Sequence, residues 1–60
     1  MNDKKKAKKL VEKLAQDEDS DVRYRIADRD DLSKKLVEQL AQDKDPDVRW
    51  RIENNYNVDN

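Results

Sequence analysis

The residues of this chain that could do chemistry are mostly carboxylates, and they gather in two acidic segments. Residues 17–21 read DEDSD and residues 28–31 read DRDD. Such clusters can hold a cation or supply a carboxylate pair for acid–base work. A calcium loop of the EF-hand type, however, needs a glycine at its sixth position, and this chain has no glycine. We therefore predict that the acids cap helices and stabilise helix starts, without binding a metal.

The residue types that usually carry catalysis are missing. The sequence contains no histidine and no cysteine, and its two serines, Ser20 and Ser33, stand where helices are expected to begin. A phosphate-binding loop of the Walker type also requires glycine. We therefore expect no enzymatic activity, no cofactor and no metal.

Four arginines form two pairs, Arg23 with Arg25 and Arg49 with Arg51. A row of arginines can bind the phosphates of nucleic acid. The two members of each pair are two residues apart, however, and therefore point to nearly opposite sides of a helix. Acidic residues surround them, and the net charge of the chain is −1. Phosphate binding through these arginines is therefore the alternative hypothesis and not the main one.

Two aromatic residues are candidates for a binding surface. Tyr24 and Trp50 occupy equivalent places, and helical periodicity directs both away from the neighbouring valine and isoleucine. Tryptophan and tyrosine often anchor protein interfaces, but they can equally pack on a flanking helix with their polar tips in water. Both interpretations stay open. The predicted interface residues are Tyr24, Trp50, Ile52 and Tyr56.

The N-terminal segment is rich in lysine, which allows two interpretations. A basic amphipathic helix can contact nucleic acid or an anionic membrane, or it can form the solvated cap that the first layer of a helical repeat needs. We favour the cap. The residues that the nucleic-acid alternative would use are Lys4, Lys5, Lys8 and Lys9.

The elements that must position these residues come from an internal repeat. KKLVEKLAQDEDSDVRYRIA (residues 8–27) and KKLVEQLAQDKDPDVRWRIE (residues 34–53) share 15 of 20 residues at an offset of 26. A fixed period of this length marks a helical repeat protein. We therefore divide the single domain, residues 1–60, into a first repeat (about residues 8–33) and a second repeat (about residues 34–60).

Each repeat is predicted to contain a longer helix, a turn and a shorter helix. Apolar residues recur at helical spacing over residues 4–16, and the second repeat shows the same pattern from residue 34. Ser33, Asp19 and Asp45 suit helix N-caps, and Pro46 suits a first helical position. The shorter helices are expected at residues 20–27 and 46–54, with α or 3₁₀ character left open.

The composition leaves little material for a core. Apolar residues make up 33% of the 60 residues and charged residues 48%, against about 45–50% and about 25% in ordinary globular domains. Burial should barely offset conformational entropy in so small a chain, and there is no cysteine for a disulfide. The apolar side of Val48, Ile52 and Trp50 also lacks a following helix. We therefore expect a second molecule to complete the core.

The second repeat resembles the leucine-rich repeat variant family and, more loosely, HEAT repeats. The resemblance covers about residues 8–57. The residues that carry it are Leu40-Ala41, Asp43, Asp45-Pro46, Val48-Arg49 and Ile52. It implies stacked helical layers, a scaffold or binding role and no catalytic residues. It also implies a ladder in which the arginine after the valine binds an acid of the neighbouring repeat. The residues matched to that ladder are Asp19, Arg23, Asp45 and Arg49.

Together these patterns predict an all-α protein with four helical segments, arranged as a minimal α-solenoid. The expected function is a protein-interaction module that associates with itself, and the alternative is a nucleic-acid-binding adaptor. No apolar run is long enough to span a membrane, and the N-terminus lacks the apolar stretch of a signal peptide. We therefore expect a cytoplasmic protein.

Overall fold

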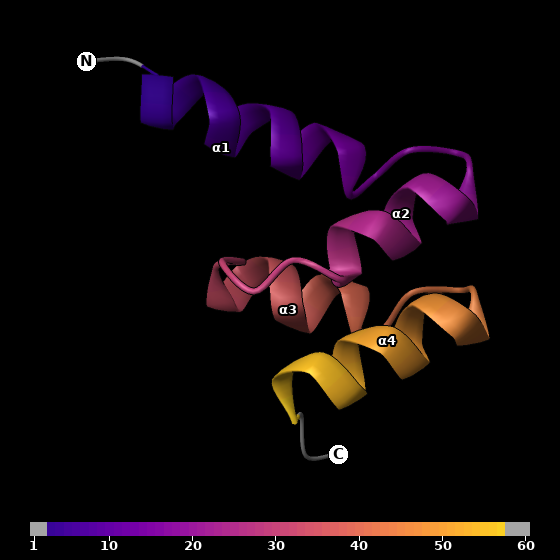
Figure 1. The fold of residues 1–60 in the computed structure, drawn as a ribbon. Coiled ribbons are helices and arrows are strands. Elements are labelled where there is room, and N and C mark those ends of the chain that lie inside the picture. The colour runs from indigo at the N-terminus through magenta and orange to yellow at the C-terminus, as the bar shows by residue number, and fades with distance from the viewer. Residues whose placement is uncertain (1–2, 58–60) are drawn as a thin grey trace.

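The computed structural model describes residues 3–57, with side chains from residue 9 onward, and this part of the chain is helical without any strand. Its four helices are α1 (Asp3–Leu14), α2 (Ser20–Ala27), α3 (Lys34–Leu40) and α4 (Pro46–Tyr56). Figure 1 shows α1 and α4 at opposite ends of the molecule, with α2 and α3 between them. The predicted all-α class with four helical segments is therefore confirmed.

Short polar side chains start three of the helices, as predicted. The carboxylate of Asp19 accepts a hydrogen bond from the N–H of Asp21, and Ser33 accepts one from the N–H of Leu36. Asp45 accepts bonds from two N–H groups in the first turn of α4, where Pro46 occupies the beginning of the helix. These bonds satisfy backbone donors that have no partner inside a helix. Both short segments left open between α and 3₁₀ are α-helices.

The predicted order of a longer helix followed by a shorter one is right for the first repeat and wrong for the second. The helices α1 and α2 have 12 and 8 residues, whereas α3 and α4 have 7 and 11. The helix α3 begins at Lys34, directly after its N-cap Ser33, whereas α1 begins five residues earlier in the repeat, at Asp3. The last turn of α4 is held by two bonds to the end of the first repeat: the Asn55 amide donates to the carbonyl of Ala27, the last residue of α2, and the Tyr56 hydroxyl donates to that of Arg29. The helix then ends at Asn57 in the left-handed conformation, which asparagine tolerates better than most residues.

The core is small and lies where α2 meets the second repeat. The helix α2 packs most extensively against α4 and also contacts α1 and α3. The side chains that meet there come from all parts of the chain after α1: Ala15, Ile26, Ala27, Leu36, Leu40, Val48 and Ile52. Leucine, isoleucine and valine at these positions place the apolar faces of three short helices against one another.

One expectation about the end of the chain needs correction. Val48 and Ile52 were predicted to lack a neighbour within the chain, but both are fully buried. Their neighbours are α2 and α3, because α4 turns its apolar face back toward the preceding helices. Trp50 points away from this core, and 54% of it is exposed.

Two leucines at equivalent positions of the repeats test where the core lies. Leu36 is 4% exposed, and Leu10, 26 residues earlier, is 56% exposed. We predict that Leu36→Ala lowers the free energy of unfolding by roughly 2–5 kcal/mol, whereas Leu10→Ala changes it by less than about 1 kcal/mol. Urea denaturation followed by circular dichroism at low protein concentration measures both. Equal losses in the two variants would contradict this placement of the core.

Candidate functional site

The most buried charged group among the described residues is the guanidinium of Arg23. The residue is 5% exposed, and its Nε and Nη2 donate to the two carboxylate oxygens of Asp43 over 2.9 and 3.2 Å. Its Nη1 donates to the backbone carbonyls of Asp17 and Glu18. The hydrogen bonds with Asp43 raise the pKa of Arg23 above its ordinary value. Arg23 therefore joins the turn after α1 to the turn after α3.

This arrangement corrects the predicted ladder. Arg23 does contact an acid of the second repeat, but that acid is Asp43 and not Asp45. Asp19 and Asp45 act instead as N-caps of α2 and α4. Arg49 donates to the backbone carbonyl of Asp43, as Arg23 does to that of Asp17.

The motif of the resemblance contains Asp43, but the predicted ladder uses the N-cap residues Asp19 and Asp45 and does not assign Asp43 to Arg23. The repeat itself contained a usable signal. Asp43 and its equivalent Asp17 are among the identical positions. Each accepts a hydrogen bond from the N–H two residues later, which leaves further carboxylate lone pairs for an arginine.

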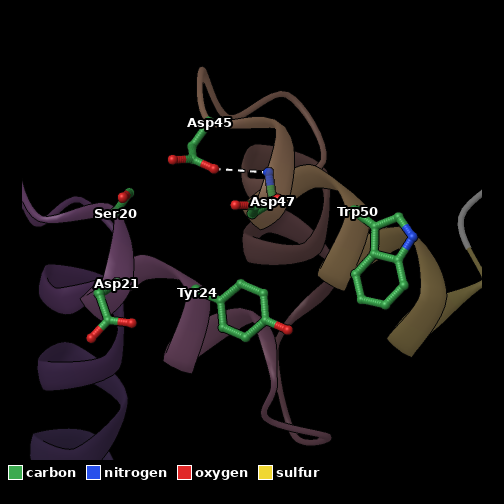
Figure 2. A pocket seen from close by; sticks show the side chains of 6 residues that line it. All are labelled: Ser20, Asp21, Tyr24, Asp45, Asp47 and Trp50. Atoms are coloured by element: carbon green, nitrogen blue, oxygen red, sulfur yellow. Dashed lines mark hydrogen bonds between the residues drawn. The ribbon is translucent and has the colours of Figure 1, made fainter.

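An open groove of about 410 Å³ lies between the N-terminal parts of α2 and α4. Its lining consists of two pairs of equivalent residues, together with the first residue of α2 and the N-cap of α4: Asp21 and Asp47, Tyr24 and Trp50, Ser20 and Asp45. Figure 2 shows the rings of Tyr24 and Trp50 facing the same open space, with Asp45, the N-cap of α4, and Asp47, in its first turn, above Tyr24. The volume is at the lower end of the roughly 300–1,000 Å³ usual for ligand sites. The groove can therefore accept one or two long side chains.

The negative charge of the groove comes from acidic residues at the starts of α2 and α4. Asp21 and Asp47 lie in the first turns of α2 and α4, where the helix dipole favours acidic groups. The N–H of Asp47 is the main cause of a lowered pKa at Asp45, aided by the Ser20 hydroxyl and the charge of Arg23. Arg25 is near Asp21, but both side chains are largely exposed. Aromatic faces beside carboxylates attract cations.

The four predicted interface residues have different environments. Trp50 is exposed, whereas Tyr24 packs partly against the core and also lines the groove. Ile52 is fully buried and is therefore unavailable for binding, which corrects its assignment. The Tyr56 hydroxyl accepts from the N–H of Leu32 and donates to the carbonyl of Arg29. Tyr56 therefore fastens α4 to the preceding linker.

The residues of the nucleic-acid hypothesis are only partly described. The side chains of Lys4, Lys5 and Lys8 lie outside the described part, and Lys9 is exposed. Most arginines of the described range contact a carboxylate within the chain: Arg23 contacts Asp43, Arg25 contacts Asp21, Arg29 contacts Asp31 and Arg51 contacts Asp28. The structure thus brings no row of free arginines together in residues 3–57.

Neither a metal site nor a membrane span is found in the part of the chain that the structure describes. No group of three or more acidic side chains there is arranged to hold a metal ion. Among the same residues, no helix combines the length and the apolar character needed to cross a bilayer.

Comparison of the chain with known protein families, with curated proteins and with solved structures finds no match. Over residues 3–57 the structure is that of a small all-helical protein, and the internal repeat is a feature of its sequence.

The two equivalent aspartates test the importance of the buried ion pair. We predict that Asp43→Asn lowers the urea midpoint of unfolding several times more than Asp17→Asn does. Asparagine can keep the turn hydrogen bond that each aspartate accepts, but in place of Asp43 it leaves the buried Arg23 without a counter-charge. Circular dichroism during urea titration gives both midpoints. A similar shift of the midpoint in the two variants would show that the ion pair between Arg23 and Asp43 contributes little to stability.

The lowered pKa of Asp45 predicts a stability change with pH. A carboxyl whose pKa is lower in the folded state stabilises the fold fully above its unfolded pKa of about 3.9, and this contribution disappears as the pH falls through the folded value. We expect Asp45→Asn, which keeps an acceptor for the helix N–H groups, to show a shallower loss of stability below about pH 4. Unfolding free energies measured between pH 2 and 5 test this, and an unchanged slope would contradict it.

Proposed function

We propose that this protein is a non-catalytic protein-interaction module built from two stacked helical repeats, and that the groove between α2 and α4 holds a cationic side chain of a partner protein. The observation that carries the proposal is the exposure of Trp50, at 54%, beside Tyr24 in an acidic groove. The resemblance to leucine-rich repeat variant proteins supports the class.

The exposure of Trp50 is informative because apolar residues are scarce in this chain. Only 33% of the residues are hydrophobic, and the core uses other residues of α4, namely Val48 and Ile52. Large aromatic side chains left at the surface are enriched in protein interfaces, where they anchor binding. Tyr24 gives the groove a second ring from the neighbouring helix, so that a bound side chain would contact both α2 and α4.

The charge of the groove selects the chemistry of its occupant. Three of its lining residues, Asp21, Asp45 and Asp47, carry carboxylates. A guanidinium group can stack on an aromatic face and donate to carboxylates at the same time. We therefore infer that the occupant is an arginine or lysine within an exposed segment of another protein.

Nucleic acid fits this groove poorly because both partners would be negatively charged. A nucleic-acid adaptor would rely on the lysines of α1. Four of the arginines, namely Arg23, Arg25, Arg29 and Arg51, each contact a carboxylate within the chain. Such binding would weaken steeply as salt is added.

The groove hypothesis predicts binding of a short arginine-rich peptide with blocked ends. The chain has a single tryptophan, Trp50, so a change in its fluorescence reports binding of the peptide directly. Calorimetry should show at least about tenfold weaker binding for Trp50→Ala. The exposed Lys35 of α3 provides a control, because Lys35→Ala lies outside the groove and should bind as the wild type does. The same peptide with glutamate in place of arginine should not bind.

Equal affinity of the wild type and Trp50→Ala for the peptide would overturn the groove as the binding site. Binding of a single-stranded oligonucleotide that is lost in a variant with Lys8 and Lys9 changed to alanine would instead support the nucleic-acid alternative.

A further inference from the structure

The two ends of the molecule expose the two halves of a contact that is already made inside it. Positions 26 residues apart are equivalent in sequence, so each side chain of one repeat can be compared with its counterpart. We define the leading face by four residues of the second repeat and their equivalents in the first. In the second repeat these residues are Leu36, Leu40, Asp43 and Val48, and in the first they are Leu10, Leu14, Asp17 and Val22.

The leading face is covered in the second repeat and open in the first. Leu36 is 4% exposed and Leu10 is 56% exposed. Leu40 and Val48 are fully buried, whereas their equivalents Leu14 and Val22 are half-buried. The cover of the second repeat is α2, which contacts both α3 and α4. No described element occupies the corresponding place in front of α1.

The opposite surface, the trailing face, shows the reverse difference. We define it by Ala15, Arg23 and Ala27 in the first repeat and by the equivalent Ala41, Arg49 and Glu53 in the second. All three residues of the first repeat are buried, and all three of the second are half-buried. The trailing face of the first repeat is covered by the second repeat, and within residues 3–57 nothing follows α4 to cover the trailing face of the second.

Arg49 and Asp17 are the unmatched halves of the buried ion pair. Arg49 keeps the bond to the carbonyl of Asp43 that corresponds to the bond from Arg23 to Asp17. The carboxylate that binds Arg23 comes from the following repeat, and within residues 3–57 no element follows α4 to supply its equivalent to Arg49. Asp17 keeps the turn bond from the N–H of Asp19, as Asp43 does from that of Asp45. The residue that Arg49 would need, at the place equivalent to Asp43, is Asp17 of another molecule.

We propose that the trailing face of one molecule stacks on the leading face of the next, with Arg49 of the first paired to Asp17 of the second. The occupant of each open face is thus a second copy of this chain. The contact reproduces the one between the two repeats, because the residues that make it are the same or equivalent. It is heterologous, so one molecule can add to the next in a growing row. The inference rests on the proposed interaction function but uses a surface separate from the groove.

Several substitutions make the contact between molecules differ from the one inside the chain. On the trailing side, Glu53 stands in place of Ala27 and Asn54 in place of Asp28; on the leading side, Arg29 and Asp30 stand in place of Asn55 and Tyr56. The hydrogen bonds that the Asn55 amide and the Tyr56 hydroxyl donate to carbonyls of the first repeat are therefore not reproduced between molecules. The ion pair between Arg51 and Asp28 has no counterpart, because Asn54 is neutral. The row is therefore held less tightly than the repeats of one chain.

Light scattering behind a sizing column, at a series of concentrations, tests the proposal. The average molar mass of the wild type should rise continuously with concentration. Arg49→Glu places two carboxylates at the contact, and Asp17→Arg places two guanidinium groups there. Each variant alone should associate at least about tenfold more weakly than the wild type. An equal mixture of the two variants should recover association, because every contact between unlike molecules then joins opposite charges.

Each variant has a control of equal charge change. The exposed turn residues Lys44 and Glu18 are equivalent positions that hold opposite charges. Lys44→Glu and Glu18→Lys each install the residue that the other repeat carries, and both should associate as the wild type does. Leu10→Glu should remove association and leave the monomer folded, since Leu10 is exposed in it. Circular dichroism verifies the fold of every variant.

A wild-type mass that stays at one monomer over the whole range would overturn the proposal. So would a closed dimer that withstands Arg49→Glu, or a mixture of the two variants that does not recover. Trp50→Ala should leave the association intact, and Arg49→Glu should leave peptide binding intact. Failure of the groove and failure of the stacking are therefore separate results.

Discussion

The guanidinium of Arg23 is enclosed by the turn that follows α1 and the turn that follows α3. A buried charge of this kind is tolerated only when its donors are all directed at acceptors, since removing it from water costs several kcal/mol. Here three nitrogen atoms reach two backbone carbonyls and both oxygens of Asp43. The position of α3 relative to α2 depends on this pair, and the apolar contacts of α4 depend in turn on that position.

The apolar core around this pair is small, and the fold compensates with polar contacts at the helix ends. Caps at Asp19, Ser33 and Asp45 satisfy the first turns of three helices. At the other end of α4, the amide of Asn55 and the hydroxyl of Tyr56 bind carbonyls near the end of α2. These bonds replace water at backbone groups that a short helix would otherwise leave exposed.

The same repeat that builds the fold explains its two candidate surfaces. Equivalent positions on α2 and α4 place Tyr24 and Trp50 along one groove, beside the acidic residues that stabilise the starts of both helices. Along the direction in which the repeats follow one another, residues 3–57 leave the leading face of the first repeat and the trailing face of the second open. Arg49 and Asp17 show this most clearly, because each retains the backbone contact of its counterpart, whereas the buried ion pair is formed by Arg23 and Asp43.

The sequence by itself determined the local structure: four helices, their N-caps at Asp19, Ser33 and Asp45, and the all-α class. Periodicity and capping act over a few residues, so a sequence displays them directly. Only the tertiary structure decided that Arg23 pairs with Asp43 and not with Asp45, that Ile52 is buried, and that α4 is longer than α3. Each of these depends on contacts between residues 20 or more positions apart, whose geometry follows from how the helices pack and not from the spacing along the chain.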